Sequence, residues 1–429
     1  MPKKFFKTVP YRFAPLDVTV NNQEPEYVFL IKGSFSFAPG RAAVPEEEEQ
    51  QAEFAGDTPY MDEIGRSLRY GTDLVAYKPF GEMILTADCC APAGQQLRER
   101  RCWFEAGSLR KELLVTGDRV WVHAAEGRVA IDGPMPFSRI PLRWERAFGG
   151  LAHPENPMGR GMDAFEDADG KRRRYLPNVE NPRTPVRALE DAPEPIGVGP
   201  VSPIAASRRA YQGTRDQRWA LFRAPLPPSD YNPCAEQSAP SDQWVDGYWR
   251  GDEIVRLGGM DPVHEVIETR LPCRRPRLFV DVVTGPDTRN FIEVPVALDT
   301  VHVDVNERRL ILTWRRAFAV ATRDASEIDA IYLTEESMAN EPAPLAEHYD
   351  DYLRRRGPEP EPRELRLERA EAEAVAEARK TLTGANVDPS VLKAFDEAKT
   401  AQAKFDLVLN LVKSKTAELE RMTANLTRL

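Results

Sequence analysis

Few residues of this chain stand at the spacings that catalysis or metal binding requires. The histidines are His123, His153, His264, His302 and His348. No two of them form an HxxxH or HExxH pattern, which would place two imidazoles on one helix face as metal ligands. The GxSxG pattern of a serine nucleophile is also absent. We therefore expect no metal, no cofactor and no catalytic residue, and we expect His302, which alternates with valines, to point outward from a strand.

Paired carboxylates and adjacent cysteines are the next candidates for chemistry. Asp73 and Glu82 could perform acid–base catalysis on a carbohydrate or ester if they faced one cleft at roughly 5–9 Å. A chain with 68 acidic residues offers many such pairs, so a hydrolase on a β scaffold is the weaker alternative. Cys89 and Cys90 would face opposite sides of a strand, and a buried apolar role is expected for them. The sequence therefore favours a protein that is not an enzyme.

Aromatic side chains in a proline-rich segment point to protein binding instead. Residues 151–250 are dense in proline, glycine and asparagine, and proline excludes regular helix and central strand. The same segment carries several tryptophans and tyrosines, so we expect ordered loops packed on β structure, where binding residues often lie. Trp, Tyr and Arg dominate the energetics of protein interfaces. The candidate protein-binding residues are Trp219, Tyr231, Trp244, Trp249 and Arg146.

The elements that would position these residues include an apparent internal repeat. The pattern W-x-R-A-F starts at Trp144 and again at Trp314, 170 residues later. Similar residues recur at nearly the same spacing upstream, which predicts that 81–148 and 251–318 are two copies of one β module. Both tryptophans are expected to fill a core. The predicted fold class is mainly β, with two related antiparallel sandwich or barrel modules joined by Pro-rich loops and a C-terminal helical hairpin or coiled coil.

Apolar alternation predicts individual strands within these modules. Residues 27–37 predict a buried strand near the N-terminus. Residues 113–122 predict a hairpin around Gly117-Asp118, and residues 301–314 predict a second hairpin. Ile140, Leu142 and Trp144 alternate with polar residues and predict a half-buried strand.

The C-terminal part of the chain has a helical pattern. A linker at 351–362 precedes Ala/Glu/Arg-rich sequence, and Asp388 with Pro389 predicts the start of another helix. Apolar residues then repeat every seven positions. The seam candidates are Phe405, Val412, Leu419, Met422 and Leu426. Two alternatives stay open: a helical hairpin that folds on itself or on the body, and an intermolecular coiled coil.

These patterns divide the chain and exclude several classes of protein. The predicted segments are a first β module at 1–150, a loop region at 151–250, a second β module at 251–350, the linker at 351–362 and a helical tail at 363–429. The net charge of −10 argues against a nucleic-acid binder or an anionic membrane surface as partner. No apolar run reaches the ~18 residues of a membrane span. Five cysteines without a CxxC pair favour free thiols in the cytoplasm.

Several stretches resemble a family of uncharacterised domains encoded beside type VI secretion components in Gram-negative bacteria. They include SLRYGTDLVAYKPFGEMILTADCCAPAGQ, LLVTGDRVW, PFSRIPLRWERAFGG, LPNVENP, PIGVGPVSP and SDQWVDGYWRGDEIVRLGGMDP, in consistent order over roughly 25–335. Cys89-Cys90 stands where the family often has small residues and His, and Cys234-Ala235 stands where it often has Arg-Phe. The tail at 360–429 lies outside the resemblance.

The resemblance implies an adaptor or chaperone without catalytic residues. Members of that family are taken to bind a toxic effector in the cytoplasm and to help load it onto the secretion spike. The expected partners are therefore a secreted effector or a spike protein, with no nucleic acid and no membrane, and self-association through the C-terminal helices is a further expectation. The alternatives are a structural component of the secretion apparatus and, less favoured, a hydrolase.

Overall fold

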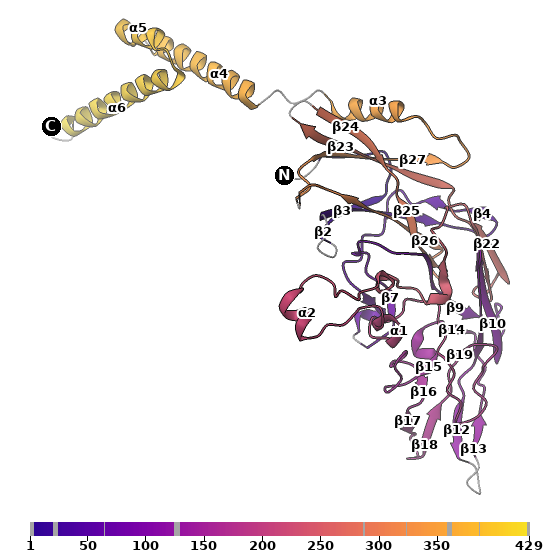
Figure 1. Cartoon of the computed structure of the whole chain (residues 1–429). Coiled ribbons are helices and arrows are strands. Elements are labelled where there is room, and N and C mark those ends of the chain that lie inside the picture. Colours follow the sequence, from indigo (N-terminus) through magenta and orange to yellow (C-terminus); the bar gives the residue numbers. More distant parts are fainter. Residues whose placement is uncertain are drawn as a thin grey trace. The chain divides into compact units, whose positions relative to one another are not determined.

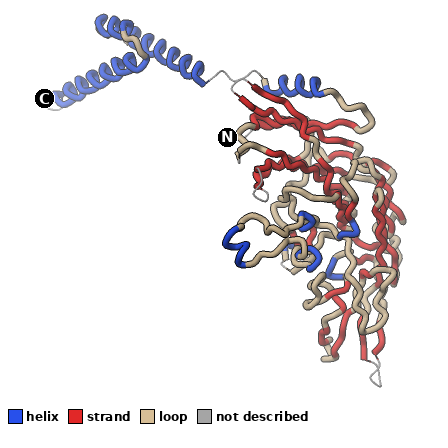
Figure 2. Tube along the Cα trace, viewed as in Figure 1, coloured by secondary structure: helices blue, strands red, loops and turns tan. Residues whose placement is uncertain are grey.

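The computed structural model describes residues 4–19, 25–63, 65–123, 129–285, 288–322, 324–357, 363–385 and 387–426. The chain forms two compact units, Met1–Tyr352 and Leu353–Leu429. Strands dominate the first unit, whereas the second is helical (Figure 2). The expectation of a mainly β protein with C-terminal helices is confirmed. Among the described residues, no helix combines the length and apolar character needed to cross a membrane.

Three large sheets build the first unit (Figure 1). The seven-stranded sheet has the order β2 (Arg12–Thr19), β3 (Pro25–Ser36), β26 (Arg309–Ala319), β25 (Ala297–Asp304), β8 (Gly81–Thr86) and β20 (Trp244–Val245), with β5 (Val44–Pro45) on β3. The six-stranded sheet has the order β19 (Val179–Glu180), β11 (Leu109–Thr116), β10 (Glu99–Ala106), β21 (Ile254–Gly258), β22 (Val266–Arg270) and β4 (Arg41–Ala42). A four-stranded sheet has the order β1 (Lys4–Lys7), β27 (Ile328–Ser337), β23 (Arg274–Gly285) and β24 (Thr288–Val294).

Smaller sheets extend from this body. One of them has four strands, in the order β13 (Val129–Asp132), β12 (Val120–His123), β18 (Arg172–Tyr175) and β17 (Ala164–Glu166). The others have two strands each: β14 (Arg139–Pro141) with β9 (Asp88–Cys90), β15 (Phe148–Gly149) with β16 (Arg160–Gly161), and β6 (Thr58–Pro59) with β7 (Leu68–Tyr70). The sheets are mixed, because β1 runs parallel to β27, β8 to β25 and β4 to β22. No sheet of the described residues closes into a barrel.

One continuous core joins the three large sheets. It includes Phe29 of β3, Phe104 of β10 and Val280 of β23, all less than 2% exposed. The other face of the four-stranded sheet is covered by α3 (Leu345–Arg356), since Tyr352 packs with Phe279 in a separate apolar cluster. Alternate residues of β23 therefore enter two different cores, as the two-residue period of a strand requires.

The predicted duplication is not confirmed. Trp144 begins a short 3₁₀ helix, η3 (Trp144–Arg146), whereas Trp314 lies within strand β26. The two segments also do not form separate modules, because β8 from the first lies beside β25 from the second in one sheet. Both tryptophans are buried, as expected, so the repeated letters reflect similar demands for apolar bulk in two different local structures.

Two local predictions are wrong and two are confirmed. Residues 113–122 contain strands β11 and β12, but these do not pair with each other. Gly117 instead donates its N–H to Arg98, and a Cβ on Gly117 would lie 1.8 Å from the Met135 carbonyl oxygen, so the glycine permits a close backbone approach. The strand predicted through Trp144 ends at Pro141. The buried strand at 27–37 and the hairpin at 301–314 are present as β3 and as β25 with β26.

The second unit contains α4 (Arg363–Gly384), α5 (Pro389–Glu397) and α6 (Ala401–Leu426). Asp388 caps α5 as predicted, accepting the Ser390 N–H at 2.8 Å. Helices α4 and α6 contact each other, which gives the helical hairpin. Phe405 is half-buried and Val412 is exposed, while the side chains of Leu419, Met422 and Leu426 lie outside the described residues. The intermolecular coiled coil stays a prediction.

Candidate functional site

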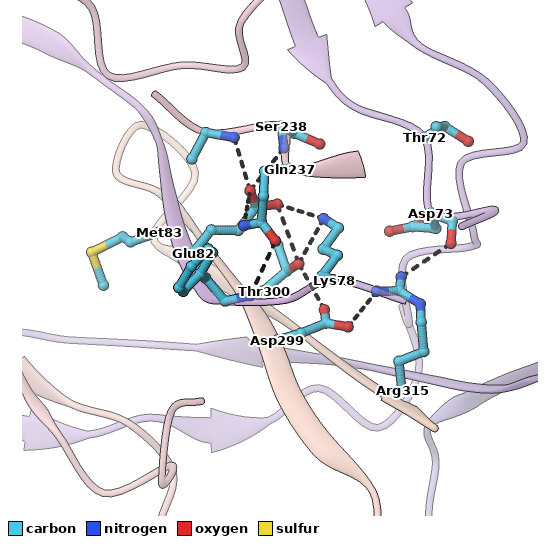
Figure 3. Close-up of polar contacts among 12 residues, drawn as sticks. Thr72, Asp73, Lys78, Glu82, Met83, Gln237, Ser238, Asp299, Thr300 and Arg315 are labelled. Carbon is cyan, nitrogen blue, oxygen red and sulfur yellow. Dashed lines mark hydrogen bonds and ion pairs between the residues drawn. The ribbon is translucent and has the colours of Figure 1, made fainter. Parts of the chain in front are cut away.

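A fully buried carboxylate lies at the centre of the first unit. Glu82 is the second residue of β8, whose six residues are all buried between β25 and β20. Its Oε2 accepts the backbone N–H groups of Ser238 at 2.8 Å and Ala239 at 2.9 Å, and the Gln237 Nε2 at 3.1 Å. Its Oε1 pairs with the Lys78 ammonium (Figure 3). One side chain of the sheet therefore holds three consecutive residues of a loop that lies 155 or more positions away in sequence.

Glu82 belongs to a larger set of acidic and basic side chains, here called the buried charge network. Its members are Lys32, Lys78, Arg315, Asp73, Glu82 and Asp299, none more than 8% exposed. Lys32 pairs with Asp73 at 2.6 Å, and Arg315 pairs with Asp299. Arg315 also donates to the backbone oxygen of Asp73 at 3.1 Å, which links the pairs (Figure 3). Three cations thus meet three carboxylates, and the network is neutral as a whole.

Burial and pairing act in opposite directions on the charges of the network. Burial lowers the pKa of Lys32 and raises the pKa of Asp299, because both lose hydration. The Asp73 carboxylate opposes the first shift and the Arg315 guanidinium opposes the second. Buried pairs of this kind stabilise a fold little compared with apolar packing, but removing one partner leaves an unpaired buried charge. The position of the loop at 237–239 therefore depends most directly on Glu82, which accepts its hydrogen bonds, and on Lys78, which pairs with Glu82.

Further buried side chains hold the same loop region. Lys111 of β11 donates to the Gly197 oxygen at 2.6 Å, to Asp242 at 2.7 Å and to the Gln243 amide oxygen at 2.9 Å. Trp144 donates its indole N–H to the Pro200 oxygen at 2.9 Å. The proline-rich segment is thus fixed on the sheets by these side-chain hydrogen bonds together with short strand pairings, such as those of β19 with β11 and of β20 with β8.

His302 borders the network, and its position differs from the sequence expectation. It lies on β25 with its ring 5.2 Å from the Tyr70 ring and its Nε2 2.9 Å from the Thr86 hydroxyl. Tyr70 covers this face of β25, so His302 is buried rather than pointed outward. Burial lowers the pKa of His302 to about 3, and the positive charges of Lys32 and Arg69 act in the same direction. The imidazole is therefore neutral in the folded protein over the physiological pH range.

His302 is expected to make the first unit sensitive to mild acid. Between about pH 3 and pH 6.5 the unfolded chain binds a proton at His302 that the folded chain does not, so stability falls as the pH drops through this window. At about pH 5 the loss is about 2 kcal/mol relative to neutral pH. Urea unfolding of His302→Gln at about pH 7.5 and pH 5 should show a correspondingly smaller pH dependence. The exposed His264→Gln serves as control, and equal pH dependence in wild type and His302→Gln would contradict this assignment.

The network leaves little room for a substrate. The cavity beside Lys32, Asp73 and His302 has a volume of about 20 Å³, which is space for about one water molecule. Asp73 and Glu82, the carboxylates considered for acid–base chemistry, are each paired with a lysine. Among the described residues, no group of three His, Cys, Asp or Glu side chains is arranged to hold a metal ion. The chemistry that this arrangement supports best is the positioning of loops.

A larger cavity lies among those loops. Its volume is about 430 Å³, and its walls include Trp144, Tyr211 and Trp244 together with the buried Lys111 and Arg208. The Lys111 ammonium donates to Gly197, Asp242 and Gln243. The Arg208 guanidinium donates to the backbone oxygens of Ala235 and Val201. The buried cations of this cavity therefore also serve to hold loop backbone in place.

The predicted protein-binding residues fall in different environments. Trp249 is buried, with its indole N–H donated to the Glu82 backbone oxygen at 3.0 Å. Trp244 is half-buried and stacks on Phe80, and Tyr231 is half-buried and donates its hydroxyl to Glu236. Arg146 pairs with Asp118 at 3.1 Å and donates to Asn178 at 3.1 Å. Three of these side chains thus hold loop structure together, and Trp249 belongs to the core.

Trp219 lies on a projecting loop, residues 214–230, here called the α2 tip because it contains α2 (Gln217–Phe222) (Figure 1). The loop is closed at its base, where the Thr214 hydroxyl donates to Asp230 at 2.7 Å. Trp219 donates its indole N–H to the Leu226 oxygen at 2.8 Å. Leu221 and Phe222 are 68% and 79% exposed. The α2 tip therefore presents two large apolar side chains to solvent from a backbone that is held by its own hydrogen bonds.

Sequence reasoning missed most of the buried charge network. Lys32, Lys78, Asp299 and Arg315 were not among the candidate residues. The signal was the presence of single charges inside apolar strand sequence, such as Lys32 in YVFLIKGSFSF, because unpaired lysine is almost never fully buried. That signal identifies a buried charge but not its partner, which here lies 41 residues away.

Comparison with known proteins gives one match. The model of a family described as "Uncharacterized protein conserved in bacteria (DUF2169)" matches residues 22–315, which include the whole buried charge network and the α2 tip. No curated protein and no solved structure matches the chain.

Proposed function

Since the chain belongs to the DUF2169 family of proteins conserved in bacteria, we propose that it is a non-enzymatic adaptor whose β unit holds another protein. The observation that carries the proposal is the long loop region at 181–250. Buried side chains fix it on the sheets, yet it exposes Leu221 and Phe222. Exposed apolar groups on a fixed backbone cost hydration free energy in the free protein and are typical of binding surfaces.

The bound protein that we propose is an effector of a type VI secretion system. The adaptor holds this effector in the cytoplasm and helps load it onto the secretion spike. The support for this choice is the family resemblance carried by stretches such as SLRYGTDLVAYKPFGEMILTADCC and PFSRIPLRWERAFGG. A preformed loop surface suits a chaperone, because little conformational entropy is lost when a prearranged surface binds.

The test is co-expression with the effector encoded beside this reading frame. We expect a stable complex to co-purify and effector secretion to fall when the adaptor gene is deleted. A β-sheet protein of similar size and charge serves as the control for non-specific capture. If no complex forms and secretion is unchanged on deletion, the adaptor function is wrong.

The second candidate function is a structural component of the secretion apparatus. It is favoured by α6, where Leu409 and Val412 are 51% and 54% exposed on a helix that carries a heptad pattern. Self-association through these helices would be seen by light scattering of the purified chain. A symmetric high-order assembly that Leu409→Asp and Val412→Asp abolish would support this candidate over a cargo adaptor, whereas a monomer would contradict it.

A further inference from the structure

Resting on the adaptor function, we propose that the α2 tip is the docking element of this protein and that it binds an acidic segment of the partner which also carries large apolar side chains. The inference names both the surface and the chemistry of its occupant. Four features of the tip carry it: fixed backbone, exposed apolar groups, a groove, and arginines without carboxylate partners.

The backbone of the tip is organised before any partner binds. Asp216 caps α2 by accepting the Trp219 N–H at 2.8 Å, and Asp230 accepts the Thr214 N–H at 2.9 Å. Arg223 donates its Nε to the Pro227 oxygen at 3.1 Å. Both carboxylates of the tip are therefore used within the loop. A partner meets a surface that is already formed, so binding loses little of its free energy to ordering.

The apolar surface of the tip is exposed without an apolar neighbour to cover it. Leu221 and Phe222 are adjacent at the end of α2, and both turn most of their surface to solvent. Phe222 borders a groove of about 590 Å³ whose lining also includes Trp219, Arg218, Arg223 and the two carboxylates that are bonded within the loop, Asp216 and Asp230. Burying a Leu or Phe side chain in a partner is worth about 1.5–3 kcal/mol. A partner with large apolar side chains therefore gains the most from this surface.

The charge of the tip selects for acidic partners. Arg215 lies over the Trp219 ring at 5.5 Å, and among the described residues no carboxylate forms an ion pair with Arg215, Arg218 or Arg223. The whole chain carries a net charge of −10, so this arginine-rich tip differs in sign from the molecule as a whole. Carboxylates on the partner would supply the missing ion pairs and increase the rate of association.

A second copy of this acidic chain is the competing occupant. A tip that entered an acidic surface elsewhere on another copy would make a head-to-tail contact, and such contacts form rings or open-ended chains rather than closed two-fold dimers. We favour a different protein, because a loading adaptor must leave its docking surface free for cargo. Self-association through the tip is an explicit outcome of the test.

The test measures binding of the full-length chain to the effector encoded beside its reading frame, by isothermal titration calorimetry. Phe222→Ser and Arg218→Glu are each expected to weaken the affinity by about tenfold or more, and Arg218→Lys should retain most of it. Raising the salt from about 50 to about 500 mM should weaken wild-type binding more than that of Arg218→Glu. Leu151→Ser and Arg172→Glu, exposed residues outside the tip, are the matched controls and should bind as the wild type does.

Each outcome decides between the proposals. A wild-type complex that the tip variants keep at full affinity overturns the docking role of the tip and leaves the adaptor function standing. A wild type that self-associates, with tip variants that are monomeric, assigns the tip to a second copy and overturns the acidic cargo segment. The absence of any complex with the wild type contradicts the adaptor function and this inference with it. Because the substitutions lie on an exposed loop, an unchanged midpoint of urea unfolding will show that the variants fold.

Discussion

Replacing Glu82 by glutamine is expected to lower the free energy of unfolding of the Met1–Tyr352 unit by about 3–5 kcal/mol. The substitution keeps the size of the side chain but removes the charge that pairs with the buried Lys78. It also places an amide NH₂ among groups that are themselves donors, the N–H groups of Ser238 and Ala239. An unpaired ammonium and at least one unsatisfied N–H then remain in the interior.

Urea unfolding followed by tryptophan fluorescence measures this effect. All seven tryptophans lie in the first unit, so the signal reports on that unit alone. The control is Glu268→Gln on β22, which removes an exposed carboxylate paired with Arg256 of β21 and should cost less than about 1 kcal/mol. A loss below about 1 kcal/mol for Glu82→Gln would show that the network does not hold the loop as described.

Trp249→Ala is expected to have a comparably large effect, about 3–5 kcal/mol of stability, because it removes a buried aromatic side chain. Trp249 packs directly on Gly81, where a Cβ would lie 3.1 Å from the indole, and it donates to the Glu82 backbone oxygen. The substitution would leave a cavity beside β8 and remove the hydrogen bond from the indole to Glu82.

Comparing Trp249→Ala with Trp219→Ala distinguishes a tryptophan of the core from a tryptophan of the α2 tip. Trp219 lies on the α2 tip, outside the main core, so its removal should change global stability by about 1 kcal/mol or less while weakening effector binding. The same urea titration and the same calorimetry measure both variants. If Trp249→Ala unfolds like the wild type and loses binding instead, Trp249 is a contact residue and its core role is wrong.

The sequence predicts secondary structure correctly where the signal lies within a few neighbouring residues. Strand β3 and the hairpin of β25 and β26 follow from apolar alternation, and Asp388 with Pro389 marks the start of α5, because each signal acts over a few residues. The hairpin predicted at 113–122 is wrong because the backbone of Gly117 contacts residues outside this segment. It donates its N–H to the Arg98 oxygen and lies against the Met135 carbonyl.

The buried charge network could not be assembled from the sequence for the same reason. The place of Lys32 within apolar strand sequence is a signal of a buried charge that the sequence analysis missed, and its pairing with Asp73 and the contact of Glu82 with Ser238 span 41 and 156 residues. With 68 acidic and 58 basic residues, no spacing rule selects these pairs. The repeated W-x-R-A-F pattern suggested a duplication that the structure does not confirm. The same residue types begin a 3₁₀ helix at Trp144 and lie within a strand at Trp314.

Hydrogen–deuterium exchange of the loop region, in the free chain and in the effector complex, tests the central claim most directly. The account predicts slow exchange at Ser238 and Ala239 in both states, since their N–H groups donate to the buried Glu82 carboxylate, and exchange at 214–226 that slows when the effector binds. Fast exchange at Ser238 and Ala239 in the free chain, or unchanged exchange at 214–226 in the complex, would contradict it.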